Sequence, residues 1–272
     1  MEFVKANFHT HTPRCHHAVG EEREYIEAAI KLGFSTLGFS DHAPYFFDEG
    51  YISPVRMLPK EAEGYVNTLK TLREEYKDKI DIKIGFEMEY YPKYFGKTLE
   101  FLKNLDIDYL ILAQHYTDNE YDGIRASLSS NGKAEFEKYI EQVCRGIETG
   151  VFSYVAHPDC INLGKDLRKR NPEEYSETLK EGLRKICKAA KNQNIPLEIN
   201  LLGQAEGMIY PSDELFCVLA QENMPCILGC DAHSPKGLNR ARAEKAVLKK
   251  AKKYGIYLMN GTELNLKKIG KR

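Results

Sequence analysis

Histidines and acidic residues recur in close pairs along this chain, and imidazole and carboxylate groups together suit metal chemistry. The pairs are His9-Thr10-His11, Asp41-His42 and Asp231-Ala232-His233. Imidazole nitrogens mixed with carboxylate oxygens bind Zn, Fe or Mn ions well. His9 and His11 are two residues apart, so on a β-strand both rings point to the same side. The pattern predicts a metal-dependent hydrolase.

The same residue types recur where predicted strands end. Glu87, His115 and His157 each follow an apolar run, as the three pairs do. In an α/β barrel the C-terminal ends of the strands converge on one face, so side chains distant in sequence can meet there. A lone histidine near a strand end is more often structural, but the shared placement favours one multinuclear metal site.

Two assignments within this set stay open at the level of sequence. We assign His17 as a ligand and leave out its neighbour His16, although spacing alone would allow the reverse. Asp41 either orients the adjacent His42 from outside the ligand shell or caps the following loop.

Short apolar runs alternate with longer amphipathic stretches from end to end, which is typical of a barrel with helices packed outside. The expected strands are 3–8, 36–39, 80–87, 109–113, 152–156, 197–200, 226–229 and 256–259. A helix is expected from Pro172 to about Asn192, because Asn171 can cap it and Pro172 fits its first turn. We predict seven or eight βα units in a single α/β domain over residues 1–272.

Composition narrows the class of partner. Lys and Arg number 39 against 40 Asp and Glu, a net charge of -1, so a small substrate is favoured over nucleic acid. A signal peptide and an apolar stretch of membrane-spanning length are both lacking, so we expect a cytoplasmic protein without a membrane partner. The seven cysteines form no C-x-x-C pair and are expected to be reduced. Oligomeric state is not predicted.

Together these motifs resemble the PHP (polymerase and histidinol phosphatase) superfamily over nearly the whole chain. The matching segments are His9-Thr10-His11 with His17, Ser40-Asp41-His42, Gly85-Phe86-Glu87, Ala113-Gln114-His115, Ala156-His157-Pro158 and Gly229-Cys230-Asp231-Ala232-His233-Ser234. Within that superfamily, the length and the loop around Met57 are most similar to the histidinol-phosphate phosphatases.

The resemblance implies a distorted, TIM-like (β/α)7 barrel that carries three divalent transition-metal ions, which are Zn, Fe or Mn in relatives. One ion would be held by His9, His11, Glu87 and Asp231, the second by Glu87, His115 and His157, and the third by His17, His42 and His233. The implied reaction is hydrolysis of L-histidinol phosphate in histidine biosynthesis, by attack of a metal-activated hydroxide on phosphorus. Glu87, Asp231 and His233 are the predicted catalytic residues.

Phosphate-binding side chains are less clearly marked. Arg168 and Arg240 follow strand ends, and we predict them as the substrate-binding residues. The chain departs from its relatives at two other places. It has no basic residue in the turn after Glu198-Ile199-Asn200, and none in the segment 158–162.

Several other functions compete with this interpretation. An amidohydrolase also begins with His-x-His, but it would want a metal-bridging lysine where this chain has Glu87. Within the superfamily the alternatives are a general phosphomonoesterase, a phosphotyrosine-protein phosphatase and a nuclease. A non-catalytic metal-binding scaffold is a further alternative. The aromatic loop from Ala43 to Leu58 is expected to be either a lid over the site or a plug on the barrel rim.

Overall fold

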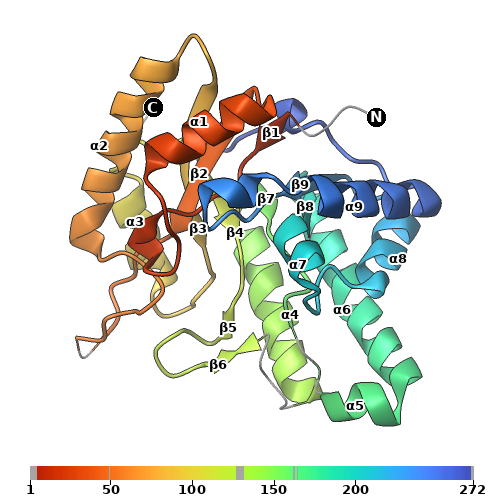
Figure 1. The fold of residues 1–272 in the computed structure, drawn as a ribbon. Coiled ribbons are helices and arrows are strands. Elements are labelled where there is room, and N and C mark those ends of the chain that lie inside the picture. The colour runs from red at the N-terminus through yellow and green to blue at the C-terminus, as the bar shows by residue number, and fades with distance from the viewer. Residues whose placement is uncertain (1–4, 49, 127–131, 162, 164, 271–272) are drawn as a thin grey trace.

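A seven-stranded parallel sheet forms the centre of the molecule (Figure 1). The computed structural model describes the whole chain except residues 1–4, 49, 127–131, 162, 164 and 271–272. The strands, in their order across the sheet, are β1 (Ala6–Asn7), β2 (Thr36–His42), β3 (Asp81–Met88), β4 (Tyr109–Leu112), β7 (Tyr154–Val155), β8 (Leu197–Asn200) and β9 (Cys226–Gly229). All six neighbouring pairs run parallel, so all seven strands end at the same edge.

The first and last strands meet beyond their ends and nearly close the sheet into a barrel. A parallel bridge joins Thr10 to Ala232, where the amide of His11 donates to the Ala232 carbonyl at 2.9 Å. The amide of Ala232 donates in turn to the His9 carbonyl at 3.3 Å. The distorted (β/α)7 barrel expected from the sequence is confirmed.

Helices connect the strands and cover the outside of the barrel (Figure 1). They are α1 (Glu22–Leu32), α2 (Pro59–Tyr76), α3 (Phe95–Leu102), α4 (Lys133–Glu148), α5 (Lys165–Arg170), α6 (Pro172–Asn192), α7 (Leu201–Glu206), α8 (Asp213–Gln221) and α9 (Ala241–Tyr254). Short 3-10 helices lie at η1 (Pro13–Cys15), η3 (Pro235–Leu238) and η4 (Gly261–Glu263). A separate two-stranded hairpin, β5 (Tyr116–Thr117) and β6 (Ile124–Arg125), follows β4.

Local capping explains where the longest helix begins. The Asn171 side chain accepts a hydrogen bond from the Glu174 amide at 3.2 Å, and Pro172 occupies the first turn. The inward face of α6 is apolar, with Leu179, Leu183 and Ile186 buried. The helix predicted over these residues is confirmed.

The eighth predicted strand is wrong. Residues 256–259 make only one isolated bridge, from Leu258 to Cys226 at the start of β9. Beyond the end of β9, the chain pairs instead with the segment after β1, through the bridge between Thr10 and Ala232. Residues 256–259 therefore pair only with the start of β9 and do not form a strand.

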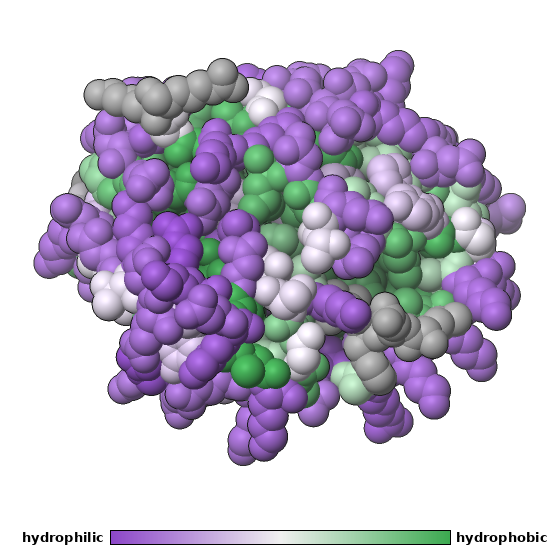
Figure 2. Space-filling view, turned by 90° about the horizontal axis from the view of Figure 1, so that it is seen from above, coloured by the Kyte–Doolittle hydropathy of each residue, from purple (hydrophilic) through white to green (hydrophobic). Residues whose placement is uncertain are grey.

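The outer surface is largely hydrophilic in the face shown in Figure 2, where apolar residues gather in recesses. Among the helices of the described residues, none is both long and apolar enough to cross a membrane.

Candidate active site

Glu87, near the end of β3, lies at the centre of the histidines predicted as ligands. Its carboxylate is fully buried and faces ring nitrogens of five histidines. The distances are 2.9 Å to His42 Nδ1, 3.0 Å to His157 Nε2, 3.2 Å to His9 Nε2, 3.5 Å to His11 Nε2 and 3.8 Å to His115 Nε2. The strand ends therefore converge as the barrel geometry requires.

Asp231 joins the remaining residues to this centre. Its Oδ1 lies 3.2 Å from His11 Nε2, 3.4 Å from His233 Nδ1 and 3.6 Å from His9 Nε2. His233 Nε2 lies in turn 3.1 Å from His17 Nε2. All nine side chains predicted as metal ligands thus form one connected cluster.

The structure distinguishes between the two adjacent histidines of the first loop. The His17 ring lies 4.8 Å from the His233 ring and 5.4 Å from the His42 ring, measured between centroids. His16 instead is exposed and takes the left-handed position after η1, with φ 66°. The placement of His17 agrees with its selection from the sequence.

Two residues of the cluster have unusual backbone conformations. His157 has φ 26° and Asp231 has φ 48°, values in the left-handed region that non-glycine residues rarely adopt. Each is the second residue after the end of a barrel strand, where the chain turns and the side chain points into the site. Such strain is typical of functional positions.

The cluster fits divalent metal ions, because several of its buried polar atoms lie close to one another but make no hydrogen bond. These atoms include His9 Nε2, His42 Nδ1 and Glu87 Oε2. A buried polar atom without a partner is costly, so such atoms need an explanation. Groups whose ligand atoms all lie within 4.8 Å of one another include His9/His11/Glu87, His9/His157/Asp231, His17/His42/His233, His42/Glu89/His115 and His11/Cys15/His233.

Three further buried carboxylates lie behind the histidines, on the side away from the cluster centre. Glu198 Oε2 is 2.8 Å from His9 Nδ1, and Glu89 Oε1 is 3.0 Å from His115 Nδ1. Asp41 Oδ1 is 3.5 Å from His11 Nδ1, so the ring that it faces is that of His11 and not that of the adjacent His42. A carboxylate at Nδ1 fixes the ring so that Nε2 is free to bind a metal.

Glu89 and Glu198 were missed in the sequence. Glu89 stands two residues after Glu87, so the same-side spacing that identified His9 and His11 would also have identified it. Glu198 is an acidic residue inside an apolar strand, and no spacing rule marks it. The Glu198 side chain has space only because residue 229 is glycine, where an added Cβ would lie 2.2 Å from a Glu198 carboxylate oxygen.

Electrostatics divide the histidines into two groups. Burial lowers the pKa of His9, but Glu198, Asp231 and Glu87 outweigh it and raise that pKa well above its usual value. The pKa of His11 is likewise raised, since Asp231 and Asp41 outweigh its burial. Burial instead prevails at His42 and His233, and lowers their pKa values to about 4 and about 3. Without metal, the first group carries protons at neutral pH and the second does not.

The central carboxylates remain ionised despite their burial. Burial raises the pKa of Glu87, but His42, His9 and His115 hold it well below its usual value. At Asp231, His9 and His11 have the same effect on the pKa and outweigh burial. The cluster therefore offers oxygen ligands that are ionised at neutral pH.

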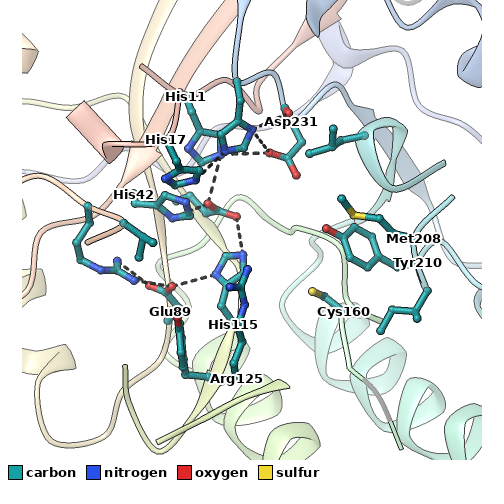
Figure 3. A pocket seen from close by; sticks show the side chains of 17 residues that line it. His11, His17, His42, Glu89, His115, Arg125, Cys160, Met208, Tyr210 and Asp231 are labelled. Atoms are coloured by element: carbon teal, nitrogen blue, oxygen red, sulfur yellow. Dashed lines mark hydrogen bonds and ion pairs between the residues drawn. The ribbon is translucent and has the colours of Figure 1, made fainter. Parts of the chain in front are cut away.

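The cluster opens into a cavity of about 580 Å³ that has two chemically different sides. Figure 3 shows His11, His42 and Asp231 on one side, and Cys160, Met208 and Tyr210 opposite them. The apolar side is made by the chain after β7 and by the segment that follows α7. A ligand with one charged end and one flat or apolar end would match these walls.

The two arginines predicted as substrate-binding residues lie elsewhere. The Arg168 guanidinium stacks on the Tyr175 ring at 5.6 Å, and Arg240 lies 3.8 Å from the carboxylate of Glu206. The arginines that line the cavity, among the described residues, are Arg56 and Arg125. Sequence alone did not single out either as a binding residue.

The aromatic loop after β2 packs onto the barrel. Tyr45 and Met57 are buried, and the Tyr45 ring lies 4.9 Å from the ring of Tyr91. Tyr45 also donates a hydrogen bond to the Glu89 carbonyl. Val55 and Arg56 of the same loop line the cavity, so the choice between a lid and a plug stays a prediction.

Comparison with known proteins agrees with this architecture. A histidinol-phosphatase of Bacillus subtilis is 28% identical over 254 residues, which cover 84% of this chain and 93% of that protein. A Deinococcus radiodurans protein named "Probable histidinol-phosphatase" is 28% identical over 238 residues, 84% of this chain and 85% of that one.

A solved structure shares the fold. It is the histidinol phosphate phosphatase of Lactococcus lactis, complexed with Zn, L-histidinol and phosphate. The TM-score is 0.68 at 20% identity, and the match covers 94% of this chain and 95% of that one. The PHP domain family matches residues 7–201, which include seven of the nine clustered side chains. Since this match spans well over half of the sequence, the chain belongs to the PHP domain family.

Proposed function

We propose that this chain is a metal-dependent phosphomonoester hydrolase that converts L-histidinol phosphate and water to L-histidinol and phosphate, a step of histidine biosynthesis. The observation that carries the proposal is the contact of one buried carboxylate, Glu87, with five histidines at the open end of the barrel. The names of the relatives support the substrate.

The proposal includes three divalent ions, drawn from Zn, Fe and Mn. The first is assigned to His9, His11, Glu87 and Asp231, the second to Glu87, His115 and His157, and the third to His17, His42 and His233. The geometry of His17, His42 and His233 supports the third ion, since their three ligand atoms lie within 4.8 Å of one another. Glu89 is an alternative ligand, because it forms a similar group with His42 and His115.

When bound, the ions would supply positive charge to the phosphoryl oxygens and would lower the pKa of a water molecule that attacks phosphorus. The residues of the chain prepare the site for this chemistry. Glu87 and Asp231 provide ionised oxygens, and Glu198, Glu89 and Asp41 hold the histidine rings in place. Glu87, Asp231 and His233 are proposed as catalytic because they lie where the ions and the cavity meet.

The two walls of the cavity support a substrate of this shape. The phosphoryl group would lie against the histidines, and the imidazole ring of the leaving group against Met208 and Tyr210. The Tyr210 ring is 5.5 Å from the His157 ring, so the apolar wall begins directly beside the cluster. Flat rings pack favourably against such aromatic surfaces.

We also propose that residues 1–272 form a single domain, because β1 and β9 close one sheet. The cytoplasmic location stays a prediction.

Phosphate release from a panel of monoesters tests the function. The protein would be purified without added metal, its Zn, Fe and Mn measured, and its kcat/KM determined for histidinol phosphate, phosphotyrosine and simple alkyl phosphates. We expect a preference for histidinol phosphate of more than about tenfold. Similar rates on every ester would reject this substrate but keep the phosphatase. Absence of turnover on all of them, with metal bound, would favour a scaffold.

A further inference from the structure

The phosphoryl group of the proposed substrate is negatively charged, so a basic side chain beside the metal cluster would bind its oxygens. Segment 158–162 follows His157 and carries no lysine or arginine. Yet Cys160 of this segment lines the cavity, so a cation missing there is missing from the substrate's surroundings. Among the described residues, the lining side chains with a permanent positive charge are those of Arg56 and Arg125.

Arg56 has no hydrogen-bond donor to spare. Its Nε donates to Glu120 at 2.7 Å, and its Nη1 donates to the Ala43 carbonyl at 2.8 Å and to Glu89 at 3.1 Å. Its Nη2 lies 2.9 Å from Glu89 and 2.7 Å from Glu120. A guanidinium has five N–H donors, and these contacts occupy all of them. Two buried carboxylates also neutralise its charge, so Arg56 is a structural residue.

Arg125 is held beside the cluster by the backbone. It pairs with Tyr116 across the hairpin of β5 and β6, and Tyr116 directly follows His115. The amide of Ala126 donates to the His115 carbonyl at 2.8 Å, which fastens the end of β6 to that histidine. Paired residues on neighbouring strands project to the same face, and both Tyr116 and Arg125 line the cavity.

The Arg125 side chain is exposed, and no ion pair or hydrogen bond of its guanidinium is found within the described part of the chain. Figure 3 shows it in the same cavity as His115, on the side away from Asp231. An arginine without a carboxylate partner is suited to bind phosphate, because its planar fork matches two phosphate oxygens.

We propose that Arg125, on the hairpin after β4, binds the phosphoryl oxygens of the substrate. The inference rests on the proposed phosphatase function. It assigns a phosphate-binding role to the short hairpin, which carries none of the nine clustered residues. It also replaces Arg168 and Arg240 as the substrate-binding arginines.

The test measures the binding of inorganic phosphate to the zinc-loaded full chain by calorimetry, and as the inhibition constant in the hydrolysis assay. Variants are Arg125→Met, which keeps the apolar stem, and Arg125→Lys, which keeps the charge. Arg184→Met is the matched control, since Arg184 lies on the exposed side of α6 and contacts Gln221. Bound zinc is determined for every variant.

We expect Arg125→Met to weaken phosphate binding by about tenfold or more, as loss of a charge-assisted contact would, with full zinc content. Arg125→Lys should recover part of this loss, and Arg184→Met should match the wild type. Unchanged phosphate affinity in Arg125→Met would overturn the proposal. Loss of zinc in that variant would also overturn it, because the residue would then support the metal site.

The outcome is separable from that of the proposed function. If the wild type fails to hydrolyse histidinol phosphate but binds phosphate in an Arg125-dependent way, the substrate is wrong and the role of Arg125 stands. If the wild type and Arg125→Met hydrolyse histidinol phosphate with equal KM and bind phosphate with equal affinity, the role of Arg125 is wrong and the proposed function stands.

Discussion

Glu198 Oε2 lies 2.8 Å from His9 Nδ1, and both side chains are fully buried. The carboxylate accepts a hydrogen bond from the Nδ1–H of His9, and His9 Nε2 faces Glu87 at 3.2 Å. The same arrangement recurs where Glu89 meets His115. Outer partners of this kind matter for metal affinity nearly as much as the ligands themselves.

We therefore expect Glu198→Gln to weaken metal binding by about ten- to a hundredfold while the fold is kept. Affinity would be measured by competition with a chromophoric chelator. The matched control is Glu177→Gln, a change at an exposed residue of α6 that pairs with Lys180. Equal affinity in both variants would mean that the Glu198 contact does not orient the ring.

Glu87→Gln should weaken metal binding more than Glu198→Gln does. Glu87 faces five imidazoles and is assigned to two of the proposed ions, so its loss would remove a ligand from each. We expect kcat to fall by more than about a hundredfold, together with a loss of bound metal. Metal analysis and phosphate release would be measured on the same sample, with circular dichroism as the check on folding. Full activity in Glu87→Gln would refute the proposed centre.

Metal binding at neutral pH should release protons. The pKa values of His9 and His11 are raised by their carboxylate neighbours, so these rings are protonated in the metal-free protein and must lose protons to bind an ion. His42 and His233, with pKa values of about 4 and about 3, are already neutral. Apparent affinity should rise with pH through the neutral range. Calorimetric titrations in buffers of different ionisation enthalpy measure the proton release. A binding enthalpy that is the same in every buffer would contradict the prediction.

The stability of the metal-free protein should fall as pH rises above about 6.5, the usual pKa of histidine. A raised pKa in the folded state adds stability that is complete below the unfolded value and is lost as pH rises through the folded one. His9 and His11 both act in this direction. Urea unfolding with a chelator present would measure the trend. The zinc-loaded protein, whose rings are neutral, should not show it.

Removing the Arg56 guanidinium should destabilise the protein. Arg56→Met would leave Glu89 and Glu120 buried without their cation, a change that costs about 3–5 kcal/mol. The free energy of unfolding from urea titration tests this, against Arg23→Met as the control. Arg23 also contacts a carboxylate, that of Glu75, but at an exposed site. A loss of less than about 1 kcal/mol from Arg56→Met would show that the pair is solvated.

Sequence reasoning placed the strand ends well, because apolar runs and capping residues are local signals. The strands 197–200 and 226–229 were predicted with the bounds that the structure has, and α6 began and ended as expected. The gathering of the predicted ligands followed from barrel geometry alone. Their roles as ligands stay a prediction, as does the number of ions.

Features that depend on three-dimensional pairing were not predictable in the same way. The segment 256–259 has the composition of a strand, but it pairs only with the start of β9, and beyond the end of β9 the chain pairs with the segment after β1. Arg125 lies in a polar loop with no distinguishing pattern, and only the hairpin register brings it beside His115. Conversely, Arg56 lies in an aromatic loop. No sequence pattern indicates that Glu89 and Glu120, far along the chain, accept the hydrogen bonds of its guanidinium.

The bridge between Thr10 and Ala232 has a consequence for how this barrel holds together. It is flanked on one side by His9 and His11 and on the other by Asp231 and His233, so the seam of the sheet runs through the metal cluster. A cation bound between these residues would hold the segment after β1 to the segment after β9. Bound metal would then stabilise the pairing between the segments after β1 and β9, and removal of the metal would weaken this pairing first.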